Sequence, residues 1–232
     1  MCTKKVNNLE IKEVLNKILL KIHILPFITA VRSLKTLEVD YGHFKSAYRW
    51  ESIDCQGKPT PWFSYPAIEY LKGLDLSKMT VFEYGSGNST LFWSKYSAGV
   101  TSIENNTKWF NLTSKKLKSN KNSQLILEKN KIKYINSINR NKTRYNIIVI
   151  DGEYRFECSQ EAIKRLKLGG FIILDNSEWF TKIRDHLRKQ NLIEIDFSGF
   201  GPINPYTTTT SIFVSREFKP KINSKIRHPG AI

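Results

Sequence analysis

The segment Met79–Ser89, which reads MTVFEYGSGNS, decides the fold. Its first half is a run of β-branched and aromatic residues that predicts a buried strand. Gly85 and Gly87 then predict a tight turn into a helix over about 89–96. Because glycine has no Cβ, a ligand can approach the backbone of such a turn closely. The segment therefore predicts a strand–turn–helix unit that binds a ligand.

Strand and helix patterns alternate through the rest of the chain. Further strands are expected at GVTSIE (99–104), SQLILE (123–128), YNIIVIDG (145–152), GGFIILDN (169–176), LIEIDF (192–197) and TTSIFVS (209–215), with helices over 107–117, 157–168 and 179–190. This alternation predicts an α/β fold, a Rossmann-like doubly wound sheet of mostly parallel strands covered by helices on both faces. We assign 61–216 to this core, 1–60 to an N-terminal helical extension on the substrate side, and 217–232 to a basic C-terminal tail that frays.

Acidic residues stand at the ends of three predicted strands. Glu83 lies two residues before Gly85, Glu104 ends the second strand, and Asp151 ends the fourth. Ligands of doubly wound sheets bind at the carboxyl ends of the strands, where the strand order reverses. If the first and fourth strands are neighbours there, Gly85, Gly87 and Asp151 line one crevice. An acidic side chain at position 104 suits the two hydroxyls of a ribose.

Two cofactors compete for this crevice. The dinucleotide fingerprint has Gly or Ala three residues after the second Gly, where this chain has Thr90. A pyrophosphate is also poorly served by a carboxylate close to the turn. A ligand with cationic sulfonium and ammonium groups would instead gain from Glu83 and Asp151. The residues favour S-adenosylmethionine over NAD, with a loop that binds no ligand as the remaining alternative.

The motifs FEYGSGNST, SIE, VIDG and GGFIILDN, in this order and spacing, resemble class I S-adenosylmethionine-dependent methyltransferases over about 79–215. PWFSYPAIEYL and GFGPINPYTTTTSIFVS resemble, more closely, methyltransferase-like proteins associated with glycan biosynthesis. The resemblance implies a seven-stranded sheet whose last strand is antiparallel beside the fifth. It implies that Glu104 holds the ribose and that the adenine lies near 128–130 or the segment after them. It also implies that the methionine part is held by Glu83, Gly85, Ser86, Gly87, Asn88 and Ser89.

Oxygen-bearing side chains at the ends of the fourth and fifth strands are the candidates for chemistry. Asp151, Asp175 and Asn176 would converge at neighbouring strand ends, and their oxygens suit Mg²⁺ or Mn²⁺. The layout is similar to catechol-type and macrolide-sugar O-methyltransferases, although 152–155 departs from the catechol pattern. A turn or helix cap is the alternative for Asp175 and Asn176. Arg155 is a catalytic candidate that would bind a substrate anion, or else a partner in an ion pair.

Several other side chains are candidates for the substrate side. Trp62, Phe63 and Tyr65, with the loop 199–206, are expected either to wall the active site or to pack in the core. Glu178, His43 and His186 are candidates for a general base, with a structural role as the alternative for each histidine.

The net charge of +16 has two explanations, a polyanionic partner or a lysine-rich composition. Residues 11–25 predict a basic amphipathic helix that suits an anionic membrane surface, or else packs on the core or on a second copy of the chain. No apolar stretch approaches the roughly 20 residues needed to span a bilayer. Neither a secretory signal nor a paired cysteine pattern is visible among Cys2, Cys55 and Cys158, so a cytoplasmic protein is expected.

These features together predict an O-methyltransferase that acts on a sugar hydroxyl of a polysaccharide or glycolipid. An RNA methyltransferase is the first alternative, because the chain is strongly basic. A non-catalytic binding protein that keeps the fold is the second. The oligomeric state is left open.

Overall fold

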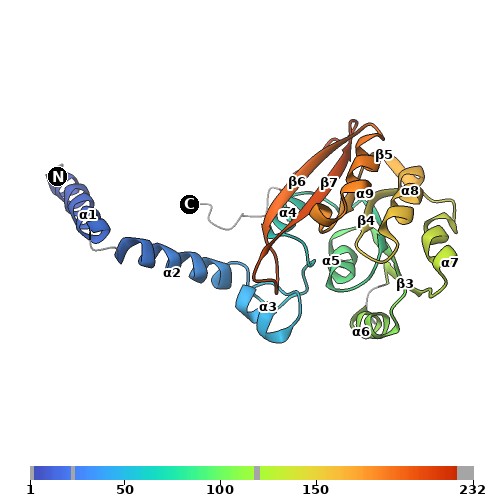
Figure 1. The fold of residues 1–232 in the computed structure, drawn as a ribbon, viewed down its shortest axis with the longest axis horizontal. Helices are drawn as coiled ribbons and strands as arrows, with labels where there is room; N and C mark the ends of the chain where they lie inside the picture. Colours follow the sequence, from blue (N-terminus) through green and yellow to red (C-terminus); the bar gives the residue numbers. More distant parts are fainter. Residues whose placement is uncertain (1–2, 22–23, 118–120, 224–232) are drawn as a thin grey trace.

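Seven strands form one mixed sheet in the computed structural model, which describes residues 3–21, 24–117 and 121–223 (Figure 1). The strands are β1 (Thr80–Tyr84), β2 (Gly99–Glu104), β3 (Ser123–Leu127), β4 (Tyr145–Ile150), β5 (Leu166–Leu174), β6 (Leu192–Phe200) and β7 (Thr207–Ser215). Their order is β3-β2-β1-β4-β5-β7-β6. β1 to β5 run parallel, and β7 lies antiparallel between β5 and β6. This arrangement confirms the predicted Rossmann-like sheet and its antiparallel last strand.

Helices connect and flank these strands. They are α1 (Thr3–Lys21), α2 (Ile24–Val39), α3 (His43–Arg49), α4 (Tyr65–Lys72), α5 (Asn88–Tyr96), α6 (Thr107–Leu117), α7 (Lys131–Ile135), η1 (Asn136–Asn139), α8 (Arg155–Arg165), η2 (Ser177–Trp179) and α9 (Thr181–Arg188). The helix expected over 157–168 is α8, which ends earlier because Leu166 adopts an extended backbone and begins β5. The helix expected over 179–190 is shorter, and a 3₁₀ turn precedes it.

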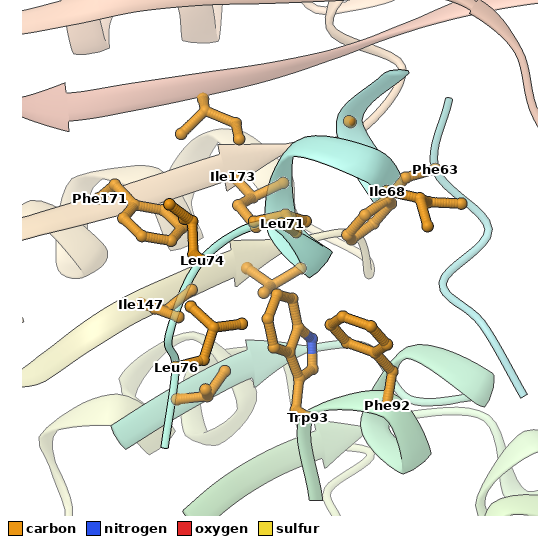
Figure 2. Packing of buried hydrophobic residues seen from close by; sticks show 14 of the residues in the cluster. Phe63, Ile68, Leu71, Leu74, Leu76, Phe92, Trp93, Ile147, Phe171 and Ile173 are labelled. Carbon is orange, nitrogen blue, oxygen red and sulfur yellow. The ribbon is translucent and has the colours of Figure 1, made fainter. Parts of the chain in front are cut away.

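Alternate residues of each central strand supply two hydrophobic cores, one on each face of the sheet. Ile147 of β4 belongs to the core under α4 and α5, where Leu71 and Trp93 are fully buried (Figure 2). The next residue, Ile148, belongs to the opposite core, which includes Ala162 of α8. A strand that is apolar on both faces can only lie between two helical layers, which explains the unbroken apolar run of β4.

β1 and β4 lie side by side, and the backbones at their carboxyl ends approach closely. A Cβ on Gly152 would lie 2.8 Å from the nitrogen of Gly85 and 3.0 Å from the carbonyl carbon of Tyr84, and it would collide with the hydroxyl of Tyr134. The nitrogen of Asp151 donates to the carbonyl of Tyr84 at 3.1 Å. This contact fixes the crevice where the strand order reverses.

The N-terminal extension consists of α1, α2 and α3. α1 and α2 lie to one side of the sheet (Figure 1), and α2 has no buried residue. No single helix of the described chain is long and apolar enough to cross a membrane. The pair Ile11–Lys21 and Ile24–Val39, bent by 100°, meets the length and composition criteria only when taken together.

The start of the C-terminal tail is ordered against the core, contrary to the expectation that the tail frays. Leu74 and Ile222 form an antiparallel bridge, and the ring of Phe218 packs on Phe171 at 5.4 Å between centroids. The nitrogen of Asp75 donates to the carbonyl of Lys221 at 2.7 Å. The expectation for 224–232 lies outside the described residues.

Gly152→Ala is expected to lower the free energy of unfolding by about 1–3 kcal/mol, because the added methyl group overpacks the contact between β1 and β4. Gly87→Ala is the matched control, since a Cβ there meets nothing within 4 Å and its φ of 163° is extended backbone. Urea unfolding of both variants measures the difference. Equal stabilities would show that the two strand ends can separate without cost.

Candidate functional site

A cavity of about 860 Å³ opens at the carboxyl ends of β1, β2 and β4. The loop after β1, the end of β2, the first residues after β4, the inner side of α6 and the segment 49–52 contribute its walls. Residues from these elements that line it include Trp50, Ser86, Gly87, Glu104, Trp109, Lys116, Asp151 and Arg155. Its volume lies toward the upper end of the roughly 300–1,000 Å³ typical of small-molecule sites.

The glycine loop presents open backbone to this cavity. Gly85 has a φ of 101°, and a Cβ there would lie 3.2 Å from the backbone of Asp151, so the position favours glycine on two counts. Gly87 has free space where a side chain would be. Both glycines, with Ser86, Asn88 and Ser89, line the cavity. The loop therefore offers a cradle in which a ligand can contact the backbone.

Glu104 is held rigidly at the wall of the cavity. Its Oε1 accepts hydrogen bonds from the backbone nitrogens of Asn105 and Asn106 at 2.9 and 2.8 Å, and its Oε2 accepts from Ser86 Oγ at 2.8 Å. These bonds fix the side chain without a cation. A carboxylate oxygen has two lone-pair sites, so Oε2 can still accept a hydroxyl of a ligand, whereas Oε1 already accepts two hydrogen bonds. The geometry fits the predicted ribose contact.

Glu83 lies beneath the glycine loop and is not among the residues that line the cavity. Its Oε2 accepts from Thr90 Oγ1 at 2.5 Å and from Ser102 Oγ at 2.7 Å, whereas its Oε1 is buried without a hydrogen-bond partner. Burial raises the pKa of Glu83 to about 7, although the hydroxyl groups around it oppose the rise. A carboxylate buried beneath the loop does not contact the cavity, but when ionised its charge favours a cationic ligand group held by the loop.

Arg155 joins the ends of β4 and β5 instead of facing outward as an anion site. Its Nε donates to the carbonyl of Gly152 at 3.0 Å, and its Nη1 donates to the carbonyl of Asp175 at 2.6 Å. Its Nη2 donates to both the carbonyl and Oδ1 of Asp151, at 3.2 and 2.9 Å. The ring of Phe180 lies under the guanidinium, 4.7 Å from its carbon. Nearly all the donors are used, so the guanidinium holds the ends of β4 and β5 together.

The predicted oxygen cluster does not form an open metal site. Asp151 lines the cavity, but Asp175 and Asn176 are not among its lining residues. Oδ1 of Asp175 accepts from Thr210 Oγ1 at 2.6 Å, and the cation of Arg155 already occupies the space beside Asp151. In the described part of the chain, no group of three or more His, Cys, Asp or Glu side chains is placed to hold a metal ion.

The two aspartates carry pKa values above their ordinary range. Burial raises the pKa of Asp151, and the guanidinium of Arg155 opposes this rise. Burial also raises the pKa of Asp175, to which the neighbouring Asp151 carboxylate adds. Of the two, only Asp151 lines the cavity, so it is the carboxylate that a bound hydroxyl group could reach.

The segment 49–52 closes one side of the cavity, a feature that the sequence analysis missed. Asn88 Nδ2 donates to the carbonyl of Ser52 at 2.6 Å and to Oε1 of Glu51 at 3.2 Å. Glu51 also pairs with Lys116 of α6, and this ion pair lowers the pKa of Glu51. Asn88 is thus a link between the glycine loop and the N-terminal extension as well as a lining residue.

Three tryptophans line the cavity, and only Trp62 was a candidate from sequence. Trp50 contacts Trp62 edge-on, with 6.2 Å between ring centroids, and has a φ of 50° that is strained for a bulky side chain. Trp109 projects from the first turn of α6, shortly after the end of β2 at Glu104. An aromatic residue so close after the predicted ribose ligand could have indicated a cavity wall from the sequence. Phe63 and Tyr65 are buried in the core instead.

The remaining candidates lie away from the cavity lining. His43 contacts the hydroxyl of Tyr65 at 3.2 Å, Glu178 accepts from the nitrogen of Thr209, and His186 packs on Phe156. Of the loop 199–206, Ile203 reaches the cavity. The segment 128–130, expected near the adenine, does not line the cavity, and Glu128 pairs with Arg140 beyond the end of β3. Residues of α6 line the cavity next to the end of β2 instead.

No family model matches the chain, and a comparison with curated proteins also finds no match. Among solved structures, an rRNA methylase from Streptococcus thermophilus is 14% identical with a TM-score of 0.50, covering 65% of this chain and 97% of that one. The O-methyltransferase TomG from Streptomyces achromogenes, solved with S-adenosylmethionine, is 12% identical with a TM-score of 0.54, covering 63% and 77%. A precorrin-6y C5,15-methyltransferase from Geobacter metallireducens is 14% identical with a TM-score of 0.52, covering 65% and 87%. The chain therefore has the Rossmann-like fold of class I methyltransferases.

Proposed function

We propose that the chain is a methyltransferase that binds S-adenosylmethionine in this cavity. One observation carries the proposal: an open glycine loop and the fixed carboxylate of Glu104 line the same cavity, and Ser86 of the loop donates a hydrogen bond to that carboxylate. The loop suits the methionine part, and the free acceptor site on Oε2 of Glu104 suits a ribose hydroxyl. The carboxylate of Glu83, buried beneath the loop, suits the ammonium group through its charge.

Methyl transfer requires alignment more than acid–base power, because the nucleophile must approach the methyl carbon in line with the bond that breaks. When bound, S-adenosylmethionine supplies an electrophilic methyl group on a cationic sulfonium. Asp151 is placed to accept the proton that an acceptor hydroxyl loses. Arg155 holds Asp151, and Asp175 supports this arrangement from the end of β5. Catalysis by positioned proton transfer contributes typically 10²–10⁴-fold.

We further propose that the acceptor is a sugar hydroxyl of a polysaccharide or glycolipid. Trp50, Trp62 and Trp109 line the cavity, and flat aromatic faces can cover the apolar C–H face of a sugar ring. The proposal contains no metal step, because Arg155 already supplies the positive charge beside Asp151.

An RNA acceptor is the second candidate, favoured by the net charge of +16. The segment 49–52 argues against it, because Glu51 and Lys116 close one side of the cavity. A methyl-transfer assay on RNA and on glycan extracts separates the two. Transfer to RNA alone, with binding that weakens steeply in salt, would replace the sugar acceptor. Cofactor binding without transfer to either extract would favour a non-catalytic protein.

S-adenosylhomocysteine is expected to raise the melting temperature saturably, whereas NAD is not. Glu104→Gln should weaken the binding by about 1–3 kcal/mol, because the negative charge that strengthens the hydrogen bond to the ribose hydroxyl is lost. Glu128→Gln is the matched control at the end of the next strand, outside the cavity, and should bind as the wild type does. Titration calorimetry measures all three proteins. Normal affinity in Glu104→Gln would remove the ribose assignment, and stabilisation by NAD would remove the cofactor assignment.

Affinity for S-adenosylhomocysteine is expected to rise as the pH rises through about 7. Burial keeps Glu83 protonated below that pH, and a cationic ammonium group favours the ionised form, so binding must release a proton there. Glu83→Gln retains an acceptor for Thr90 and Ser102 but cannot ionise, so its affinity should not vary in this pH window. A pH series of dissociation constants tests this. Parallel curves for the two proteins would exclude Glu83 from the ammonium site.

Asp151→Asn is expected to lower the rate of methyl transfer to a glycan extract by roughly a hundredfold or more. The amide oxygen can still accept from Arg155, so the fold and the affinity for S-adenosylhomocysteine should change much less. Asp175→Asn is the matched control and should retain most of the rate, since Asp175 lies outside the cavity lining. A larger loss of rate in Asp175→Asn than in Asp151→Asn would reverse these roles.

A further inference from the structure

The outer helices α1 and α2 expose two stripes of large apolar side chains. On α2, Ile24, Phe27, Val31 and Leu34 recur at helical spacing and are between 44% and 71% exposed. On α1, the residues Ile11, Val14, Leu15 and Ile18 share one face, are more than half exposed, and line a shallow hollow of about 290 Å³. Apolar residues grouped in this way mark an interaction surface, unlike singly scattered ones.

Little of the protein itself covers these stripes. α2 contains no buried residue, and only Leu37, near its C-terminal end, packs against the hydrophobic core. Both helices lie to one side of the sheet (Figure 1). Packing in the hydrophobic core therefore does not explain why these positions carry large apolar side chains.

Basic side chains border the apolar face of α1. Residues seven apart lie almost directly above one another on a helix. Lys21 follows Val14 by seven positions, and Lys12 precedes Leu19 by seven, so a lysine stands at each edge of the apolar arc. Lys12, Lys17 and Lys21 form no ion pair with any residue that the structure describes. Lysines with apolar stems can bury the stem and keep the ammonium group at a polar interface.

We propose that α1 and α2 lie on the surface of an anionic lipid bilayer, with their apolar stripes in the acyl–headgroup boundary and their lysines against the headgroups. Helices of this pattern bind in the plane of the interface. The charge selects the lipid surface over a second copy of the chain, because two chains of +16 repel each other while anionic lipids attract them. The inference does not depend on methyl transfer.

Co-sedimentation with vesicles tests the proposal on the full chain. The protein is expected to sediment with phosphatidylcholine–phosphatidylglycerol vesicles at low salt, and much less with phosphatidylcholine alone or at high salt. The double variant Phe27→Ser with Val31→Ser should lower the partition coefficient by roughly tenfold or more. The matched control Thr29→Ala with Ser33→Ala changes two exposed polar side chains of the same helix and should bind as the wild type does.

The triple variant Lys12→Gln, Lys17→Gln and Lys21→Gln should bind more weakly and lose part of the salt dependence. Each substituted side chain is exposed, and unchanged thermal unfolding would confirm that the variants fold. Absence of vesicle binding by folded wild type would overturn the proposal, as would equal binding to neutral and anionic vesicles. A dimer in light scattering that the Phe27→Ser and Val31→Ser substitutions dissociate, without vesicle binding, would assign the stripes to a second copy instead.

Discussion

The structure depends on the contact between the carboxyl ends of β1 and β4, where Gly152 has no room for a side chain. The helices that follow these two strands cover opposite faces of the sheet, so their ends frame the crevice of a doubly wound fold. The same contact sets Asp151 beside Gly85, while Gly87 remains open on the cavity side. Packing therefore requires glycine at position 152, and space for a ligand favours glycine at position 87.

Arg155 supplies a positive charge to the acidic residues at the carboxyl ends of β4 and β5. Without it, the partly exposed carboxylate of Asp151 and the buried carboxylate of Asp175 would lie near each other, an arrangement that attracts a divalent cation or a shared proton. The guanidinium instead bonds the side chain of one and the backbone of the other. It thereby replaces a mobile cation by a fixed one and leaves Asp151 as the carboxylate that faces the cavity. The positive charge at this edge belongs to the protein itself.

The sheet and its glycine loop were predictable because local pattern determines them. β4 is apolar on both faces, and only a central strand satisfies that pattern. The role of Arg155 was not predictable, because its partners depend on the distance between two strand ends. The bounds of α2 were not predicted for a different reason. None of its residues is buried, and Pro26 in its first turn suggests a break, although the first turn of a helix tolerates proline. Nor could sequence spacing reveal the bond between Asn88 and Glu51, which are 37 residues apart.

The cavity has walls of two different origins. Glu104, Asp151 and the glycine loop stand at strand ends, so the sheet fixes them regardless of what lies outside it. Trp50 and the segment around it come from the N-terminal extension, and Asn88 and Lys116 join this segment to the core. A wall joined to the glycine loop by one amide and to α6 by one ion pair can change in sequence without disturbing the sheet. In the function proposed here, cofactor binding would then depend on the sheet, and the choice of acceptor on the N-terminal extension. The extension already places Trp50, which is exposed and has a strained backbone, at the rim of the cavity.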